Sequence, residues 1–261
     1  MPDAWNPDQY HRFRDHRSAP FQDLLALVQQ IPGGRAVDLG CGSGELTSLM
    51  AEETGAADVT GVDSSTAMLA RAAAHERDGL TFTEGDLASW GIPVHPVDLV
   101  LANAALQWVP DHAEVLRRWT DALAPDGQVA VQVPTNADHL SHQVAAAIAT
   151  EEPFRSAFAG SPPPDPVAAN VLTPEAYAQL LHDLGYSQQH VRLQVYGMVL
   201  ESSDDIVEWV KGTTLTRFER TLPADRYEDF VEVYRERLRS ELGDPRPYFY
   251  AFKRILFWGR R

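Results

Sequence analysis

The sequence predicts an α/β fold built on a doubly wound parallel sheet, to which a mainly helical cap is added. Short apolar strands alternate with helices over residues 35–134, which is typical of a parallel sheet with helices on both faces. The strand expected at 96–103, "PVDLVLAN", is nearly all apolar, as a strand covered on both faces should be. After residue 134 the pattern becomes mainly helical.

The first half of the chain contains a regular series of elements. We expect two short helices over 10–31, joined near Pro20. Asp111, followed three residues later by Glu114, predicts the start of a helix through a capping box. The remaining strands are expected at 35–40, 58–63, 80–86 and 127–134, and the helices at 45–54, 65–76 and 111–123.

The second half indicates a cap inserted before the last strand of the core. Its expected helices are 139–158, 173–186, 202–222 and 224–242, with strands at 190–200 and 248–259. The proline-rich segment 160–170 is the clearest internal break. The domains expected are an N-terminal helical lid (1–31), a core (32–134 and 246–261), and a cap (135–245) from which one or two strands return to the core.

Composition excludes several classes of protein. The formal net charge of −15 disfavours a nucleic-acid partner, because an acidic surface repels phosphate groups. Cys41 is the single cysteine, so no internal disulfide can form. The sequence shows no signal-peptide pattern and no run of about 18 apolar residues that would span a membrane. These features together predict a cytoplasmic protein with no membrane partner; they leave the oligomeric state open.

The segment "VDLGCGSGELT", residues 37–47, places Gly40, Gly42 and Gly44 between an expected strand and helix. Glycine weakens both kinds of element, so this loop favours close approach of a ligand to the backbone. A dinucleotide fingerprint would require glycine at Glu45. Asp38 would repel a pyrophosphate and attract an ammonium group. The loop therefore favours S-adenosylmethionine, whose methionine end carries an ammonium group, over a dinucleotide.

Further polar residues follow the other strands, at the edge where parallel sheets bind ligands. A carboxylate at Asp63 would accept hydrogen bonds from ribose hydroxyls, and Asp86 from an adenine amino group. Met68 would lie against the adenine, and Asn103 closes the strand at 96–103. The complete set of expected cofactor-binding residues is Asp38, Gly40, Cys41, Gly42, Gly44, Asp63, Ser64, Met68, Asp86, Leu87, Asn103, Ala104 and Trp108.

Those residues match the class I S-adenosylmethionine-dependent methyltransferases. The segments "WNPDQYHRFRDHRSAP", "ANAALQWVPDH" and "WVKGTTLTRFERTLP" extend the match over nearly the whole chain, which resembles the trans-aconitate 2-methyltransferase family. The resemblance implies a Rossmann-like methyltransferase fold with a mostly parallel seven-stranded sheet and an antiparallel last strand. It also implies S-adenosylmethionine as cofactor, S-adenosylhomocysteine as product, and a methyl ester formed on a small polycarboxylate.

A carboxylate acceptor is already ionised at neutral pH, so we expect no catalytic base and no metal ion. Orientation of the reactants would then carry the catalysis. A polycarboxylate needs cations, and arginine binds carboxylates through paired hydrogen bonds. We rank Arg217 and Lys211 first and Arg14 next. The complete set of expected substrate-binding residues is Arg217, Lys211, Arg14, Tyr10, Trp209 and Tyr248.

Three alternatives remain at this point. The first is a methyltransferase for another small acceptor, such as a fatty acid, a phenol or a carbon nucleophile. An alcohol or phenol would require a base of nearly neutral pKa, for which His139, His142 and His182 are the candidates. A nucleotide-dependent oxidoreductase is disfavoured by Asp38 and by the spacing of the glycines. A protein that binds the cofactor without turnover is disfavoured by the aromatic and cationic residues of the cap.

Overall fold

The computed structural model of the chain describes residues 14–91 and 94–261, with the side chains of residues 14–17 outside that description. The chain forms two compact units. The first, the sheet unit, consists of residues 17–134, 170–194 and 254–261. The second, the cap unit, contains residues 135–169 and 195–253. Residues 170–194, which the sequence analysis assigns to the cap, therefore belong to the sheet unit.

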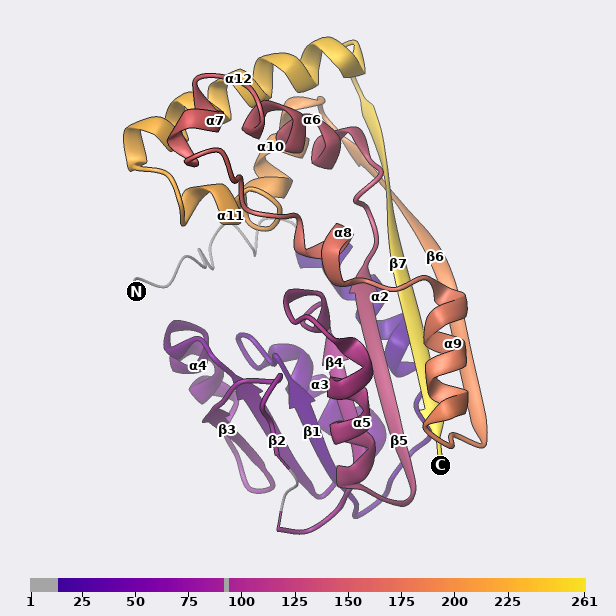
Figure 1. The fold of residues 1–261 in the computed structure, drawn as a ribbon. Coiled ribbons are helices and arrows are strands. Elements are labelled where there is room, and N and C mark those ends of the chain that lie inside the picture. The colour runs from indigo at the N-terminus through magenta and orange to yellow at the C-terminus, as the bar shows by residue number, and fades with distance from the viewer. Residues whose placement is uncertain (1–13, 92–93) are drawn as a thin grey trace. The chain divides into compact units, whose positions relative to one another are not determined.

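Seven strands form a sheet in the order β3-β2-β1-β4-β5-β7-β6, as Figure 1 shows. The strands are β1 (Arg35–Leu39), β2 (Asp58–Asp63), β3 (Leu80–Glu84), β4 (Val97–Asn103), β5 (Leu123–Pro134), β6 (Gln188–Leu200) and β7 (Tyr248–Arg260). Strands β1 to β5 pair in parallel, and β7 runs antiparallel to β5, with Val131 opposite Phe257. The predicted doubly wound, mostly parallel, seven-stranded sheet is confirmed.

The helices account for most of the remaining described chain. They are α2 (Arg14–Leu25), α3 (Glu45–Thr54), α4 (Thr66–Ala72), α5 (His112–Ala122), α6 (Leu140–Ala149), α7 (Phe154–Ala157), α8 (Pro166–Asn170), α9 (Pro174–Asp183), α10 (Asp204–Lys211), α11 (Thr216–Glu219) and α12 (Ala224–Leu242), with 3-10 turns η1 (Ala73–His75) and η2 (Leu106–Trp108). Asp111 caps α5 as predicted, because its carboxylate accepts the N–H of Glu114 at 3.2 Å.

Helices cover both faces of the sheet within the sheet unit (Figure 1). Trp119 of α5 and Tyr177 of α9 are fully buried in the cluster on one face. Phe21 of α2 and Met50 of α3 are fully buried in the cluster on the other face. Burial on both faces explains why β4 is apolar almost without interruption, and it fixes the carboxyl ends of β1, β2 and β4 at one edge.

The expected break between two helices near Pro20 is wrong for the described residues. Helix α2 runs from Arg14 to Leu25 with Pro20 inside it. A proline removes one backbone hydrogen bond and usually ends a helix. Phe21 and Leu24 follow it directly and are fully buried in the core, and this packing offsets the lost bond.

Two long helices predicted in the cap are each broken. The segment 202–222 forms α10, which ends at its C-cap Gly212, and α11, which begins at Thr216. The segment 139–158 forms α6 and α7, separated by a turn that contains Pro153. Glycine and proline are poor helix formers, and both interrupt patterns whose apolar spacing continues. The first break places Thr214 in the turn between α10 and α11.

The cap unit has an apolar core of its own. Phe218 of α11 and Phe230 of α12 lie in contact, with ring centroids 4.5 Å apart, and Phe154 of α7 packs edge-on against Phe230 at 5.0 Å. All three rings are buried, and rings of this size contribute large apolar areas to a core. This core holds α11 in place and therefore also the backbone of Arg217, the residue before Phe218.

Candidate functional site

The glycine loop joins β1 to α3, and its three glycines have different roles. Gly40, Gly42 and Gly44 have φ angles of +85°, +56° and +77°, a region that L residues with side chains rarely adopt. A Cβ atom on Gly40 would lie 2.3 Å from the Cβ of Ala105, and one on Gly44 would lie 2.6 Å from the Phe82 ring. A Cβ atom on Gly42 would meet nothing within 4 Å. Gly40 and Gly44 therefore serve packing, whereas Gly42, whose N–H donates to Asp63, leaves the backbone beside its Cα open to a ligand.

The first turn of α3 adds a second ligand-binding feature. Its N-cap residue is Gly44, which has no side chain to cap the helix. The N–H groups at a helix start carry partial positive charge and bind anions or other acceptors. The loop thus combines open backbone at Gly42 with a helix end that lacks a side-chain cap.

Asp38 lies in β1 just before this loop and is 3% exposed. Thr47 of α3 donates its hydroxyl to Asp38 Oδ2 at 2.7 Å. Burial raises the pKa of Asp38 to about 7; the Thr47 hydrogen bond opposes that rise and the charge of Asp63 adds to it. A buried carboxyl group of this kind favours a cation beside it, because a cation stabilises its ionised form.

Asp63 ends β2 and holds the loop in shape. Its Oδ2 accepts the N–H of Gly42 at 2.8 Å, and its Oδ1 accepts the N–H of Ser65 at 2.8 Å. Each carboxylate oxygen has a second lone pair, so both can still accept a ligand hydroxyl. Ser65 caps α4 by accepting the N–H of Met68 at 3.2 Å, and Met68 is 7% exposed. The neighbouring Ser64 is exposed.

The predicted residues after β3 form a tight turn. The exposed Asp86 accepts the N–H of Ala88 at 2.9 Å through its Oδ1. Leu87 is half-buried, and its carbonyl accepts the indole N–H of Trp119 at 3.3 Å. The turn thus presents the Asp86 carboxylate to solvent at the carboxyl end of β3.

The carboxyl end of β4 carries polar groups that the sequence analysis only partly identified. Asn103 Oδ1 is buried and makes no hydrogen bond within the described chain. Its register partner on β5 is Gln132, which is 1% exposed and whose Nε2 likewise makes no hydrogen bond in the described part of the chain. A buried polar atom without a partner is unusual in a folded protein and indicates a ligand or water. Gln132 gave no signal in the sequence, because it lies within an apolar strand.

The remaining predicted cofactor residues, Ala104, Trp108 and Cys41, follow β4 and β1. Ala104 has a φ of +52°, and its N–H donates to the carbonyl of Gln132 at 2.9 Å. Trp108 is half-buried in η2. Cys41 is 8% exposed, and its thiol lies where a Cβ on Gly61 would approach it to 3.0 Å. Burial raises the pKa of the Cys41 thiol, so this group stays protonated.

The predicted substrate residues lie in different surroundings. Lys211 forms an ion pair with Glu208 at 3.0 Å and is 29% exposed at its side chain. Trp209 is 4% exposed and packs on Phe252 in the cap core. Tyr248 is half-buried, with its hydroxyl 3.4 Å from His139 Nε2. Arg14 starts α2 with its side chain outside the described part, and Tyr10 lies outside the described residues.

Arg217 differs from these other candidates. Its side chain is 7% exposed, and its Nη1 lies 3.3 Å from Oδ2 of Asp165. Burial lowers the pKa of the guanidinium, and the charge of Asp165 opposes that effect. Within the described chain Nη1 meets Asp165 only as this ion pair, and neither Nη1 nor Nε has a hydrogen-bond partner. A buried cation with donors to spare is suited to bind an anion.

The candidate bases fit proton transfer poorly. Burial lowers the pKa of His139 to about 4, and the charge of His142 acts in the same direction. His142 uses both ring nitrogens, since Nδ1 lies 2.8 Å from Asp165 Oδ2 and Nε2 lies 3.1 Å from Thr214 Oγ1. His182 is exposed on α9. No cluster of three or more His, Cys, Asp or Glu residues with metal-binding geometry occurs in residues 14–91 and 94–261.

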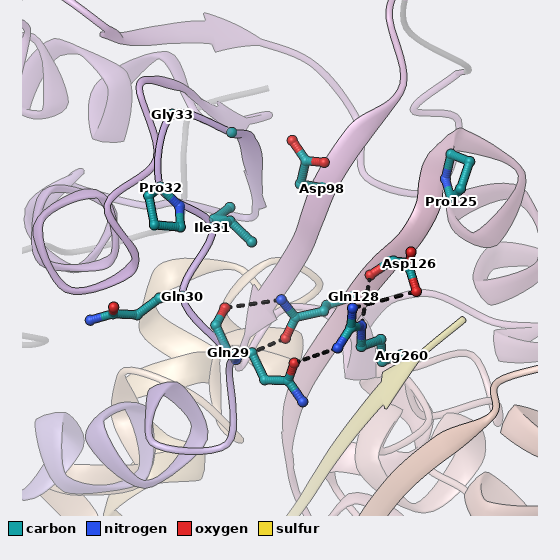
Figure 2. Close-up of a pocket in the computed structure, with 11 residues that line it drawn as sticks. Gln29, Gln30, Ile31, Pro32, Gly33, Asp98, Pro125, Asp126, Gln128 and Arg260 are labelled. Atoms are coloured by element: carbon teal, nitrogen blue, oxygen red, sulfur yellow. Dashed lines mark hydrogen bonds and ion pairs between the residues drawn. The ribbon is translucent and has the colours of Figure 1, made fainter.

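Two cavities in the sheet unit lie away from the glycine loop. The first, of about 300 Å³, is at the amino-terminal edge of the strands (Figure 2). Its polar groups bond to one another: Gln128 accepts the N–H of Gln29 at 2.8 Å, and Arg260 donates to Gln29 Oε1 at 2.8 Å. The second, of about 450 Å³, runs along β1, β2 and β3 and reaches Asp86. We assign no ligand to the first.

Solved structures support the fold. The YcgJ protein from Bacillus subtilis is 16% identical and aligns with a TM-score of 0.59 over 94% of this chain and 98% of that chain. An S-adenosylmethionine dependent methyltransferase from Mesorhizobium loti is 24% identical, with a TM-score of 0.52 over 92% of this chain and 96% of that chain. No helix among the described residues is both long and apolar enough to cross a membrane.

Sequence relatives identify the family. A family model described as a methyltransferase domain matches residues 36–127. A trans-aconitate 2-methyltransferase from Deinococcus radiodurans is 43% identical, over 99% of this chain and 98% of the relative. One from Streptomyces avermitilis is 40% identical, over 97% of this chain and 95% of the relative. The family model spans Asp38 and the glycine loop, and the two relatives match nearly the whole chain. The chain therefore belongs to the trans-aconitate 2-methyltransferase family.

Proposed function

We propose that this protein transfers the methyl group of S-adenosylmethionine to a carboxylate of trans-aconitate and releases the monomethyl ester. The relatives that share 43% and 40% of its residues are named for this reaction. One observation in the structure carries the proposal: Arg217 is a buried cation whose Nε and Nη1 have no hydrogen-bond partner in the described chain. A substrate carboxylate would supply the missing acceptors.

The sheet unit has the features needed to hold the cofactor. Asp38 would face its ammonium group, and the open backbone at Gly42 would contact its amino-acid portion. Asp63 would accept hydrogen bonds from the ribose, and Asp86 from the adenine amino group. Asn103 Oδ1, buried and unpartnered within the described residues, would accept a further donor. When bound, S-adenosylmethionine supplies a methyl group already activated by the sulfonium charge.

The chain itself has little chemistry to perform in this reaction. A carboxylate is ionised at neutral pH and needs no base to become a nucleophile. A reaction without a base agrees with the state of the histidines. His139, with a pKa of about 4, is a weak base, and both ring nitrogens of His142 are engaged in hydrogen bonds. An alcohol or phenol acceptor would need a base matched to neutral pH. Orienting the carboxylate through Arg217 and excluding water are the tasks that remain.

The proposal also covers the class of substrate and the cellular location of the protein. The acidic composition, with a net charge of −15, supports a small-molecule substrate in preference to a nucleic acid. The single cysteine supports a cytoplasmic location, where thiols stay reduced.

A labelled-methyl assay tests the proposal. The full chain is incubated with methyl-labelled S-adenosylmethionine and, separately, trans-aconitate, cis-aconitate, citrate or isocitrate. We expect label in an acid-extractable product with trans-aconitate above all, and release of that label as methanol by mild base, since esters hydrolyse and ethers do not. Label that resists base would establish a different acceptor, and equal transfer to all four acids would refute selectivity for trans-aconitate.

A further inference from the structure

A cluster of polar side chains surrounds Arg217 inside the cap unit. Its members come from four separate places: His142 from α6, Asp165 from the segment before α8, Thr214 from the turn after α10, and Arg217 from α11. We call these four residues the Asp165 cluster. All lie within one unit, so their mutual geometry is fixed by the cap core.

Asp165 is the centre of the cluster and is held on both carboxylate oxygens. Its Oδ1 accepts the N–H of Val167 at 2.9 Å. Its Oδ2 lies 2.8 Å from His142 Nδ1 and 3.3 Å from Arg217 Nη1. Burial alone would raise the pKa of Asp165, but the hydrogen bond from His142 and the charge of Arg217 outweigh it, and the pKa lies below its ordinary value. Asp165 is therefore an anion fixed in position.

His142 links Asp165 to Thr214. Because an ionised carboxylate only accepts hydrogen bonds, His142 Nδ1 must be the donor to Asp165. The other ring nitrogen, Nε2, shares a hydrogen bond with the Thr214 hydroxyl at 3.1 Å. The side chain of His142 is 8% exposed. Hydrogen bonds at both nitrogens fix the ring orientation, and this chain of contacts orients Asp165 in turn.

Arg217 has more hydrogen-bond donors than the cluster has acceptors for them. Asp165 supplies a counter-charge, and the Phe218 ring lies beneath the guanidinium, with its centroid 4.5 Å from Cζ. Nε and Nη1 nevertheless make no hydrogen bond within the described chain. A buried ion pair that served stability alone would be expected to use its donors, since unsatisfied buried donors are costly. The arrangement leaves the guanidinium oriented and still able to bind an anion.

We infer that Thr214, His142 and Asp165 form a positioning relay that orients the Arg217 guanidinium for a carboxylate of the substrate. The inference rests on the proposed function and adds three residues to it. None of the three touches the substrate; each acts through Arg217. The end of α10 at Gly212 contributes to this relay, because the turn that follows presents the Thr214 hydroxyl to His142.

A double-mutant cycle tests this relay. Asp165→Asn keeps the shape and the acceptor for Val167 but removes the charge. We expect it to raise KM for trans-aconitate at least tenfold, with kcat within threefold and the cofactor Kd unchanged. In an Arg217→Gln background the same substitution should change KM less than twofold, because the residue through which it acts is gone. A tenfold effect that persists in that background would overturn the relay.

The Thr214 variants keep the test informative if Asp165→Asn fails to fold. Thr214→Val removes the hydroxyl at constant shape and should raise KM three- to fivefold, whereas Thr214→Ser retains the hydroxyl and should restore KM to within twofold of the unmodified chain. Equal KM values for the two would refute a role for the hydroxyl. Glu151→Gln is the matched control: it breaks another arginine–carboxylate pair of the cap unit, with Arg237 at 2.8 Å, and should leave KM unchanged.

Failure of the relay and failure of the proposed function give different results. Titration calorimetry with trans-aconitate, in the presence of S-adenosylhomocysteine, measures binding without turnover. If the unmodified chain binds trans-aconitate in an Arg217- and Asp165-dependent manner but transfers no methyl group, the relay stands and the proposed reaction is wrong. If it transfers the methyl group with no dependence on Asp165, the reaction stands and the relay is wrong.

Discussion

The glycine loop of the sheet unit and the Asp165 cluster of the cap unit are both built around a buried charged group, and they are assembled in opposite ways. Asp38 and its partner Thr47 lie nine positions apart in one strand–loop–helix segment. Asp165 and Arg217 come from segments far apart in the chain and meet only through the folded cap. The first site is local, so its chemistry is visible in the sequence; the second is not.

A further difference concerns what is left unsatisfied. The loop of the sheet unit leaves open backbone at Gly42, while the cap unit leaves open donors on one side chain, Arg217. Open backbone tolerates many ligands that share a cofactor's shape, whereas a fixed guanidinium selects a planar anion. The comparison suggests that variants of the loop change cofactor affinity and variants of the cluster change substrate KM.

The largest expected effect is that of Gly40→Ala. Its Cβ would lie 2.3 Å from the Cβ of Ala105 at a φ of +85°. We expect a loss of stability of about 1–3 kcal/mol from overpacking, added to about 1–2 kcal/mol from backbone strain, and no measurable cofactor binding. Gly42→Ala meets no neighbour, so only the strain applies. Urea unfolding measures the stability of each variant, and calorimetric titration measures its cofactor affinity. Equal stability losses in the two variants would contradict the different roles assigned to these glycines.

The second prediction concerns Arg217→Gln, which leaves Asp165 without its counter-charge. Arg217→Gln also removes the cation that would pair with the substrate carboxylate, and truncating one partner of such a hydrogen-bonded charge pair costs about 2–5 kcal/mol of binding. KM for trans-aconitate should therefore rise at least thirtyfold while the cofactor Kd stays within twofold. Lys211→Gln sharpens the comparison, because Lys211 is paired with Glu208 and partly exposed. Its KM should rise less than threefold. A larger rise for Lys211→Gln than for Arg217→Gln would reverse the ranking of the two cations.

These two regions also show how far the sequence alone leads. The parallel strands, the glycine loop and the carboxylates at 38 and 63 follow from patterns within short segments, and the fold is confirmed by the strand order. The break at Gly212 was missed because the apolar spacing of 202–222 continues across it. Asp165 gave no signal, since its role depends on partners in α6 and α11 that only tertiary packing brings near. Pro20 was misjudged because the burial of Phe21 and Leu24 outweighs its local preference.

The third prediction follows from the pKa of Asp38, which burial raises from 3.8 to about 7. Between these two values the folded chain keeps a proton that the unfolded chain releases, so this group lowers stability as the pH rises from 4 to 7. Binding of a cationic cofactor favours the ionised form. Cofactor affinity should therefore rise with pH up to about 7 and level off above it. Calorimetry at pH 5.5 in two buffers of different ionisation enthalpy would detect the released proton.

Asp38→Asn provides the matched variant for this pH dependence. Asparagine keeps the acceptor for Thr47 but has no charge, so we expect cofactor affinity to fall by more than about 1 kcal/mol, the scale of a lost hydrogen bond to a charged group. The slope with pH should also disappear. A slope that persists in Asp38→Asn would assign the titration to another group and would break the link between the buried carboxyl group and the cofactor's ammonium group.

The smallest expected effect separates a structural histidine from the functional cluster. His112 in the sheet unit resembles His142, since both ring nitrogens are engaged: Nδ1 lies 2.7 Å from the Tyr177 hydroxyl and Nε2 lies 2.9 Å from the carbonyl of Leu106. Here, however, the contacts end in backbone groups, the carbonyl of Leu106 and the N–H of Leu172, which donates to the Tyr177 hydroxyl at 3.3 Å, and they include no unsatisfied cation. Tyr177→Phe should cost about 1–3 kcal/mol of stability, because it leaves Nδ1 of His112 and the N–H of Leu172 without a partner, and it should change neither KM nor cofactor Kd by more than twofold. A thermal unfolding curve and one set of initial rates are sufficient to measure this. If Tyr177→Phe altered KM as Thr214→Val is expected to, orientation of a buried histidine would have a general effect on the enzyme, and the distinction between the two units would be lost.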